Sequence, residues 1–179
     1  MPILYFHYSG LTLAVGTYKT NRFNMPLLNI VGITGNNRTP QYCLCFMSGE
    51  TFDDYKWALQ QVCTLLQVNN IPFPRVMITD RELALIEAID ELFPESDHLI
   101  CRWHVNMNVV KNCKRHFTTQ EAWEKFYLAW QAVLNSSTNE AYEKNLAELQ
   151  AFGSEFNAIE GVEYLENTWL DLWKEKLGS

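Results

Sequence analysis

Apolar and polar positions along the first fifty residues form short runs that predict three β-strands. The runs rich in β-branched and apolar residues lie at 11–15, 27–34 and 42–47. The cluster 35–38, Gly-Asn-Asn-Arg, is typical of a hairpin turn between the second and third runs. Because the connections are short, we expect an antiparallel meander.

Two units that each combine a helix and a strand are expected next. Residues 51–67 carry apolar side chains at intervals of three and four, and Thr51 with Asp54 fits the start of a helix. The run 75–79 is short, β-branched and apolar, which predicts a strand covered on both faces. A helix at 82–93 and a strand at 98–101 complete the order β-β-β-α-β-α-β.

The chain beyond residue 104 has a helical pattern. Helices are expected to begin near residue 105 and to span 119–134, 139–152 and 163–177. Aromatic residues recur on one face of two of them, around Trp123 to Trp130 and Tyr164 to Trp173. Stripes with this spacing usually pack into a core, and the alternative is an exposed apolar face that recruits a protein partner.

Charge is unevenly distributed and argues against strong binding of nucleic acid. The net charge is −7. Residues 1–115 hold ten basic and ten acidic residues, whereas residues 116–179 hold four and eleven. An acidic region repels phosphates, so we expect weak DNA binding by this chain alone.

Five cysteines, an odd number without a paired C-x-x-C spacing, make a disulfide framework improbable. The sequence has no long apolar run, and its first residues lack the basic segment of a secretory signal. We therefore expect a soluble, intracellular protein with reduced thiols and no membrane partner.

Asp80 is the principal candidate for a functional residue. It follows the predicted strand 75–79, and the carboxyl ends of central strands are where α/β sheets usually place their chemistry. The order of elements resembles the ribonuclease H-like fold, whose enzymes bind two divalent metal ions through carboxylates. An equally weighted alternative is that Asp80 caps the following helix.

The first strand offers Asp80 no acidic partner, because no Asp or Glu occurs between residues 1 and 49. Glu50, Asp53 and Asp54 are expected at a solvated helix start, where negative charge is favourable. A free-standing nuclease, which would need a second carboxylate near Asp80, is therefore the weakest of the functional hypotheses.

Two C-x-x-H pairs, Cys101 with His104 and Cys113 with His116, supply the residue types of a zinc site. A helix between the pairs would carry them apart. Buried cysteines with hydrogen-bonded histidines are the more common outcome, and zinc stays the less favoured alternative.

Four sequence blocks resemble the catalytic domain of Mutator-like element (MULE) transposases. They are residues 17–28, Ser48-Gly49-Glu50 with Asp54-Tyr55, residues 78–82, and residues 101–104. The resemblance implies a ribonuclease H-like DDE transposase that uses Mg²⁺ or Mn²⁺ and acts on DNA at transposon ends in the nucleus. Asp80 corresponds to the second acid of its triad, and Cys101 and His104 to a structural or supporting C-x-x-H.

Two departures from the family pattern predict an inactive, truncated fragment. Val15 stands where the first catalytic aspartate is expected, and the final glutamate is expected beyond residue 179. Nearby carboxylates at Glu160, Glu163 and Glu166 lack the surrounding motif and are not assigned. The alternative hypothesis is a domesticated, non-catalytic factor that binds protein or DNA.

The expected domains follow from the same resemblance. Residues 1–16 form an atypical segment that completes the first strand, 17–115 form the ribonuclease H-like core, and 116–179 begin a helical insertion.

Overall fold

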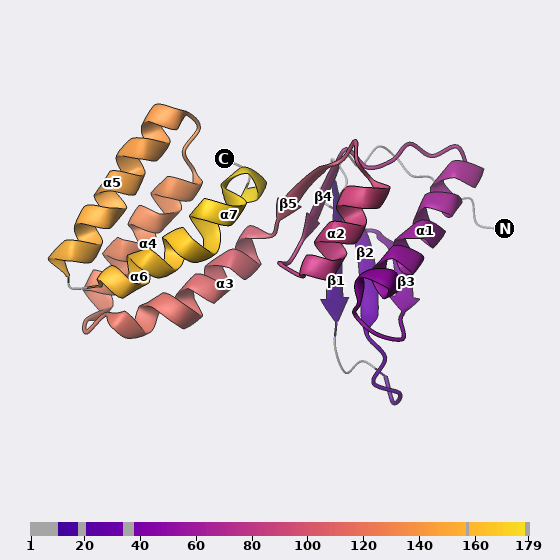
Figure 1. The fold of residues 1–179 in the computed structure, drawn as a ribbon, viewed down its shortest axis with the longest axis horizontal. Coiled ribbons are helices and arrows are strands. Elements are labelled where there is room, and N and C mark those ends of the chain that lie inside the picture. Colours follow the sequence, from indigo (N-terminus) through magenta and orange to yellow (C-terminus); the bar gives the residue numbers. More distant parts are fainter. Residues whose placement is uncertain (1–10, 18–20, 34–37, 157, 178–179) are drawn as a thin grey trace. The chain divides into compact units, whose positions relative to one another are not determined.

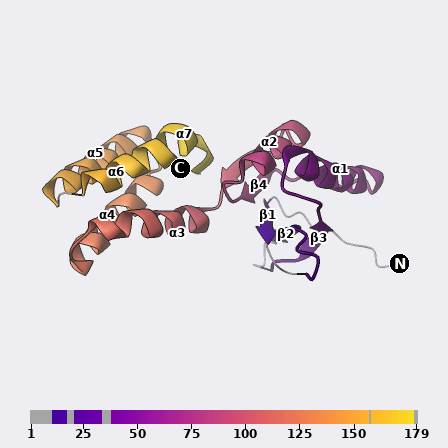
Figure 2. The same ribbon diagram turned by 60° about the horizontal axis from the view of Figure 1, so that its bottom comes forward.

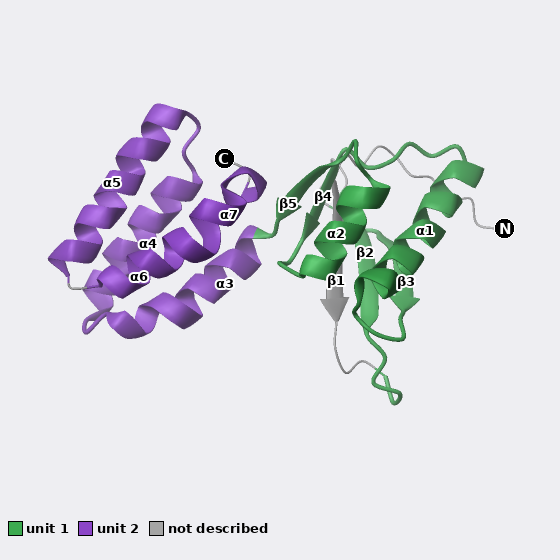
Figure 3. Ribbon diagram, in the orientation of Figure 1, with its two compact units in different colours: residues 1–101 green, residues 102–179 purple. Residues whose placement is uncertain are grey.

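The computed structural model describes residues 11–17, 21–33, 38–156 and 158–177, the first of these ranges by its backbone alone. The chain divides into two compact units, residues 1–101 and 102–179 (Figure 3). Each unit is described by itself. The family-based boundaries after residues 16 and 115 stay a prediction.

Unit 1 is a five-stranded mixed sheet with two helices (Figure 1). The sheet order is β3-β2-β1-β4-β5; β1 pairs antiparallel with β2 and β2 with β3, whereas β4 runs parallel to both β1 and β5. The predicted α/β class is confirmed, and the elements follow one another as expected. Their bounds are β1 Leu11–Thr17, β2 Leu27–Ile33, β3 Gln41–Phe46, α1 Phe52–Val68, β4 Val76–Thr79, α2 Leu83–Leu92 and β5 Asp97–Ile100.

The predicted hairpin turn at 35–38 lies almost entirely outside the described residues. The helix start at Thr51 is confirmed, because its side chain accepts a hydrogen bond from the Asp54 amide while the Asp54 carboxylate accepts one from the Thr51 amide. This reciprocal capping box satisfies two amides that the first helical turn cannot pair.

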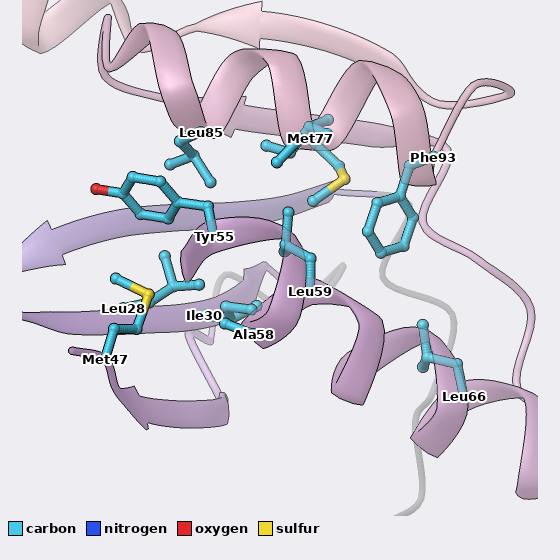
Figure 4. Packing of buried hydrophobic residues seen from close by; sticks show 12 residues of the cluster. Leu28, Ile30, Met47, Tyr55, Ala58, Leu59, Leu66, Met77, Leu85 and Phe93 are labelled. Carbon is cyan, nitrogen blue, oxygen red and sulfur yellow. The ribbon is translucent and has the colours of Figure 1, made fainter. Parts of the chain in front are cut away.

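Both helices of unit 1 lie on the same face of the sheet (Figure 2). The core between the sheet and these two helices is mainly aliphatic. It combines alternate strand residues with the inner faces of α1 and α2 (Figure 4). It includes Leu28, Ile30, Met77, Tyr55, Leu59, Leu85 and Ile89.

The expectation that the strand at 75–79 is covered on both faces is wrong. In β4, Met77 and Thr79 are buried, whereas Val76 and Ile78 are only half-buried. A continuous apolar run does not reveal which side chains face the helices, and here both helices pack against the same side.

Unit 2 is entirely helical in its described residues. Its elements are α3 Arg102–Cys113, the 3₁₀ turn η1 Lys114–His116, α4 Gln120–Leu134, α5 Asn139–Glu155, α6 Ile159–Leu165, the π-helical turn η2 Glu166–Leu170, α7 Asp171–Trp173 and the 3₁₀ turn η3 Lys174–Leu177. The last predicted helix is therefore longer and interrupted. None of the helices in the described ranges is both long and apolar enough to cross a membrane.

The aromatic stripes of unit 2 form its core, as the more common interpretation of their spacing predicted. Trp123, Phe126, Trp130 and Trp169 are all buried. Tyr127, Tyr164 and Trp173 of the same stripes are half-buried, and the alternative of a partner-binding face stays a prediction. Exposed apolar residues of the same helices include Leu128, Ile159 and Leu172.

Candidate functional site

Asp80 directly follows β4, at the edge where three neighbouring strands run in the same direction. β4 lies between β1 and β5 and is parallel to both, so the carboxyl ends of all three meet at one end of the sheet. The residue is half-buried, and its Oδ1 atom is shielded from solvent. The N-cap residue of α2 is Glu82, not Asp80. The structure therefore excludes the interpretation of Asp80 as the helix cap.

Backbone register brings Val15 and Asp80 to equivalent positions on neighbouring strands. The last paired residues of β1 and β4 are Leu13 and Ile78. Val15 and Asp80 each follow two residues later along parallel strands, so their backbone positions correspond. On the other side of β1, Val15 pairs with Asn29 of β2.

The donor set at this edge does not fit a two-metal site. Hard divalent cations need several oxygen ligands, and a valine side chain supplies none. The neighbouring Asn29 already accepts a hydrogen bond through Oδ1 from Gln41 Nε2 at 2.8 Å. Within the described ranges, no group of three or more His, Cys, Asp or Glu side chains could hold a metal ion.

A buried polar chain lies beneath Asp80 and was missed by sequence reasoning. His98 Nε2 is 2.9 Å from Thr79 Oγ1, and His98 Nδ1 is 3.5 Å from Asp90 Oδ1 on α2. The Thr79 hydroxyl donates to the Asp80 carbonyl oxygen at 2.7 Å. The only sequence signal was a histidine and a threonine within apolar strands, and their pairing depends on the register of β4 and β5.

The hydrogen-bond roles in this chain depend on the tautomer of His98. When the Thr79 hydroxyl donates to the Asp80 carbonyl oxygen, His98 Nε2 is the donor to the Thr79 oxygen. Although the order of carboxylate, imidazole and hydroxyl resembles a hydrolytic triad, Thr79 is fully buried and cannot reach a substrate. The chain instead fixes the backbone from which the Asp80 side chain projects.

The residues of the first C-x-x-H pair, Cys101 and His104, lie on different elements of the fold. Cys101 follows β5, and its amide donates to the Thr79 carbonyl oxygen, whereas His104 lies in the first turn of α3. Helix α3 begins at Arg102, three residues before the expected start near residue 105. The Nδ1 atom of His104 is buried without a hydrogen-bond partner in the described structure.

Cys113 and His116 have other partners within unit 2. Cys113 Sγ donates to the Gly161 carbonyl oxygen at 3.6 Å, and burial raises the pKa of this thiol to about 12. His116 Nδ1 lies 3.0 Å from Glu160 Oε2. These contacts agree, at this pair, with the favoured interpretation of a buried cysteine and a partnered histidine.

The carboxylates near Glu50 form a helix start, as predicted. Asp54 accepts hydrogen bonds from the Ser48 and Thr51 hydroxyls at 2.6 Å each, and these bonds lower the pKa of its carboxyl. Asp53 is exposed in the first turn of α1. Glu166, one of the unassigned glutamates, accepts from Gln150 at 2.6 Å.

Comparison with known families places the chain in one of them. The pattern of the MULE transposase domain matches residues 13–108, more than half of the chain. The chain therefore belongs to the MULE transposase domain family, as the four sequence blocks indicated.

Individual relatives match this chain over small parts of their own length. It is 37% identical over 101 residues to the PKS-NRPS hybrid synthetase cheA of Chaetomium globosum, covering 56% of this chain and 2% of that protein. Protein FAR1-RELATED SEQUENCE 2 of Arabidopsis thaliana is 27% identical over 172 residues, 94% of this chain and 19% of that protein. The chain thus spans less than a fifth of either relative.

Among solved structures, the chain is similar to the HTLV-2 integrase catalytic core domain, which was solved in complex with magnesium. The TM-score is 0.36 and the sequence identity 14%, over 90% of this chain and 88% of the integrase chain.

Proposed function

We propose that this chain is a ribonuclease H-like catalytic core of a DDE-type DNA transposase that has lost metal-dependent strand cleavage. Membership in the MULE family supports the transposase origin. The succession of elements, with β1 between antiparallel β2 and parallel β4, supports the ribonuclease H-like fold. Asp80 at the end of β4 corresponds to the second acid.

The observation that carries the loss of activity is the register of Val15 with Asp80. Phosphodiester cleavage by two metal ions requires carboxylates that bridge or flank both ions. The equivalent position on β1 has a hydrocarbon side chain, so the ligand expected from the first acid is missing beside Asp80. Such a site would lack the charge that gathers two divalent cations.

Transposases of this family act on DNA at transposon ends in the nucleus. We infer that this acidic chain binds DNA weakly, because its net charge of −7 opposes contact with phosphates. Cys101 and His104 act as supporting residues at the carboxyl end of β5 and the start of α3.

Restoring the missing carboxylate tests this proposal. We expect Val15→Asp to raise the affinity for Mn²⁺ at least about tenfold, because two carboxylates would then share the ion. Isothermal titration calorimetry and Mn²⁺ electron paramagnetic resonance measure this change in Mn²⁺ affinity. Val31→Asp, on the neighbouring β2, is the matched control that adds the same charge away from Asp80.

Incubation with DNA that carries terminal inverted repeats and with Mn²⁺ tests the loss of activity directly. We expect the unaltered chain to leave this DNA intact. Cleavage that Asp80→Ala abolishes would refute the proposed inactivity. Equal Mn²⁺ affinities of Val15→Asp and Val31→Asp would refute the assignment of Val15 to the position of the first acid.

A further inference from the structure

A pocket opens where β3 leads into α1, and the proposed transposase chemistry does not use it. Its volume is about 370 Å³, and it is lined by Phe46, Met47, Ser48, Asp53, Asp54 and Trp57. None of these six lining residues, all in the described part of the chain, is basic. The pocket therefore combines aromatic surface with negative charge.

Two aromatic side chains of this pocket are unusually exposed. Phe46 is 49% exposed and Trp57 is 53% exposed. Large aromatic residues are generally buried, and exposed ones gather at binding surfaces. The face of an indole or phenyl ring attracts a cation through its quadrupole, and tryptophan does so most strongly.

The two carboxylates of the pocket have different surroundings: hydrogen bonds hold Asp54 in place, whereas Asp53 is exposed to solvent. Hydrogen bonds from Ser48 and Thr51 lower the pKa of Asp54, so this carboxyl stays charged at neutral pH. Asp53 beside it is exposed. The amino-terminal end of α1 contributes about half a positive charge, which two carboxylates exceed. The net field in the pocket is therefore negative.

The nearest basic residue on α1 does not neutralise the pocket. Lys56 Nζ lies 2.7 Å from Glu91 Oε1 on α2 and 5.3 Å from the centre of the Phe52 ring. It is thus engaged with α2 and with Phe52. Lys56 therefore does not supply the cation for the pocket.

We propose that this pocket binds an arginine side chain from a basic segment of a partner protein. A guanidinium group is planar, stacks on aromatic rings and pairs with carboxylates through two parallel hydrogen bonds. Trp57 and Phe46 provide the rings, and Asp53 provides the available carboxylate. Nucleic acid is excluded from this pocket because its phosphates would meet the carboxylates.

The location gives such a partner access to the functional end of the sheet. β3 runs in the same direction as β1 and β4, since two antiparallel pairings separate it from β1. The carboxyl end of β3, where Phe46 lies, is therefore at the same end of the sheet as Asp80. The binding itself requires no metal and does not depend on the proposed loss of cleavage.

Nuclear magnetic resonance of the tryptophan indole groups in the whole chain tests the proposal. The probe is N-acetyl-arginine amide, and the citrulline analogue is its neutral isostere. We expect saturable shifts of the Trp57 indole signal, with a dissociation constant on the order of 1 mM, because one ring contact and one exposed ion pair contribute modestly. The citrulline analogue should bind at least about fivefold more weakly.

Two variants and two matched controls locate the site. Trp57→Ala and Asp53→Asn should each weaken binding at least about threefold, as read from the remaining pocket signals. Trp103→Ala removes an indole of similar exposure from α3, and Asp97→Asn removes an exposed carboxylate from β5; neither should change the affinity. All four residues are surface positions, so folding is retained.

Three results would overturn the proposal. The first is the absence of a saturable Trp57 shift, and the second is equal binding of the arginine and citrulline probes. The third is tighter binding of N-acetyl-lysine amide, which would show that a compact ammonium group is the preferred cation.

Discussion

The two compact units differ in how they satisfy the polar groups of their interiors. Among its described residues, unit 1 has a mainly aliphatic core and a buried polar pair, Thr79 and His98. In unit 2, a half-buried amide group pairs with a buried indole: Asn106 Oδ1 accepts from both Trp130 Nε1 at 3.1 Å and Gln131 Nε2 at 2.8 Å.

Helix α3 shows why unit 2 needs such bonds. Its polar residues point toward other helices and not only to solvent, so they require directional partners. Tyr164 donates to Asn108, and Arg102 donates to the carbonyl oxygens of Leu134 and Leu177. Unit 2 is thus held by bonds that specify one arrangement of its helices.

In unit 1, by contrast, the candidate functional groups, Asp80 and the pocket beside Trp57, lie at one end of the sheet. Asp80 rests on a buried hydrogen-bond chain, and the pocket beside Trp57 is exposed. Membership in the family does not by itself show which part of the chain holds the candidate functional residues. The comparison of the two units indicates that these residues lie in unit 1. The following experiments test that division, beginning with the largest expected effect.

Truncation of the central tryptophan should weaken unit 2 most. We expect Trp130→Ala to lower the free energy of unfolding by about 3–5 kcal/mol, because it creates a cavity and leaves Asn106 without its indole donor. Urea denaturation followed by far-ultraviolet circular dichroism measures the loss. Leu128→Ala, at a position 67% exposed on the same helix, should change stability by less than about 0.5 kcal/mol. Similar losses for both variants would contradict the buried indole.

Thiol reactivity should separate the cysteines of the two units. Burial raises the pKa of Cys113 to about 12, and it raises the pKa of Cys45 as well. Because the thiolate is the reactive form, iodoacetamide at pH 8 should label Cys113 at least about a hundredfold more slowly than Cys45, which is more exposed. Mass spectrometry of digested protein gives both rates. Comparable rates would show that unit 2 opens readily around Cys113.

The same pKa shift gives a pH dependence with a definite sign. The folded pKa of Cys113 lies above its ordinary value of 9.0. Its contribution to stability is therefore complete below pH 9 and is lost as the pH rises through about 12. Cys113→Ala should remove this part of the alkaline decline.

Removal of the buried imidazole should destabilise unit 1. We expect His98→Ala to cost about 2–3 kcal/mol, and Thr79→Val about 1–2 kcal/mol, because each removes a partner from a buried polar group. Asp90→Asn should cost less, since the Asp90 side chain is about half exposed. Chemical denaturation measures all three. An equal loss for Asp90→Asn and His98→Ala would place the main stabilising contact on α2 and not on β4.

Removal of the helix caps should give the smallest loss of stability among these variants. Thr51 caps α1 within a complete capping box, whereas Thr138 caps α5 by one hydrogen bond from its side chain to the Ala141 amide. We expect Thr51→Ala to cost about 1–2 kcal/mol and Thr138→Ala about 0.5–1 kcal/mol, measured by thermal denaturation. Thr64→Ala, within α1, is the control and should change little. A larger loss at Thr138 would reverse the predicted order.

Much of this architecture follows from local sequence patterns. Apolar spacing predicted α1 and α4 to within one residue at each end, and Thr51 with Asp54 marked the start of α1. These features depend on neighbours within a few residues, where helical periodicity and capping act. The family blocks likewise required only linear order, and they identified the MULE family.

Contacts across the sheet could not be obtained in this way. Whether Asp80 capped α2 was undecided from the sequence, since an aspartate suits both a cap and a strand end. The pairing of Thr79 with His98 joins residues 19 positions apart and depends on the register of β4 with β5. The start of α3 at Arg102, which separates Cys101 from His104, was also missed.

The sequence by itself determined the family, the succession of elements and the absence of an acidic residue before Glu50. Only the tertiary structure decided that both helices of unit 1 cover one face, that Thr79 pairs with His98, and that Val15 and Asp80 share a register. The physical reason is that periodicity specifies which residues of one element can face inward, whereas strand pairing and helix packing decide which elements they meet.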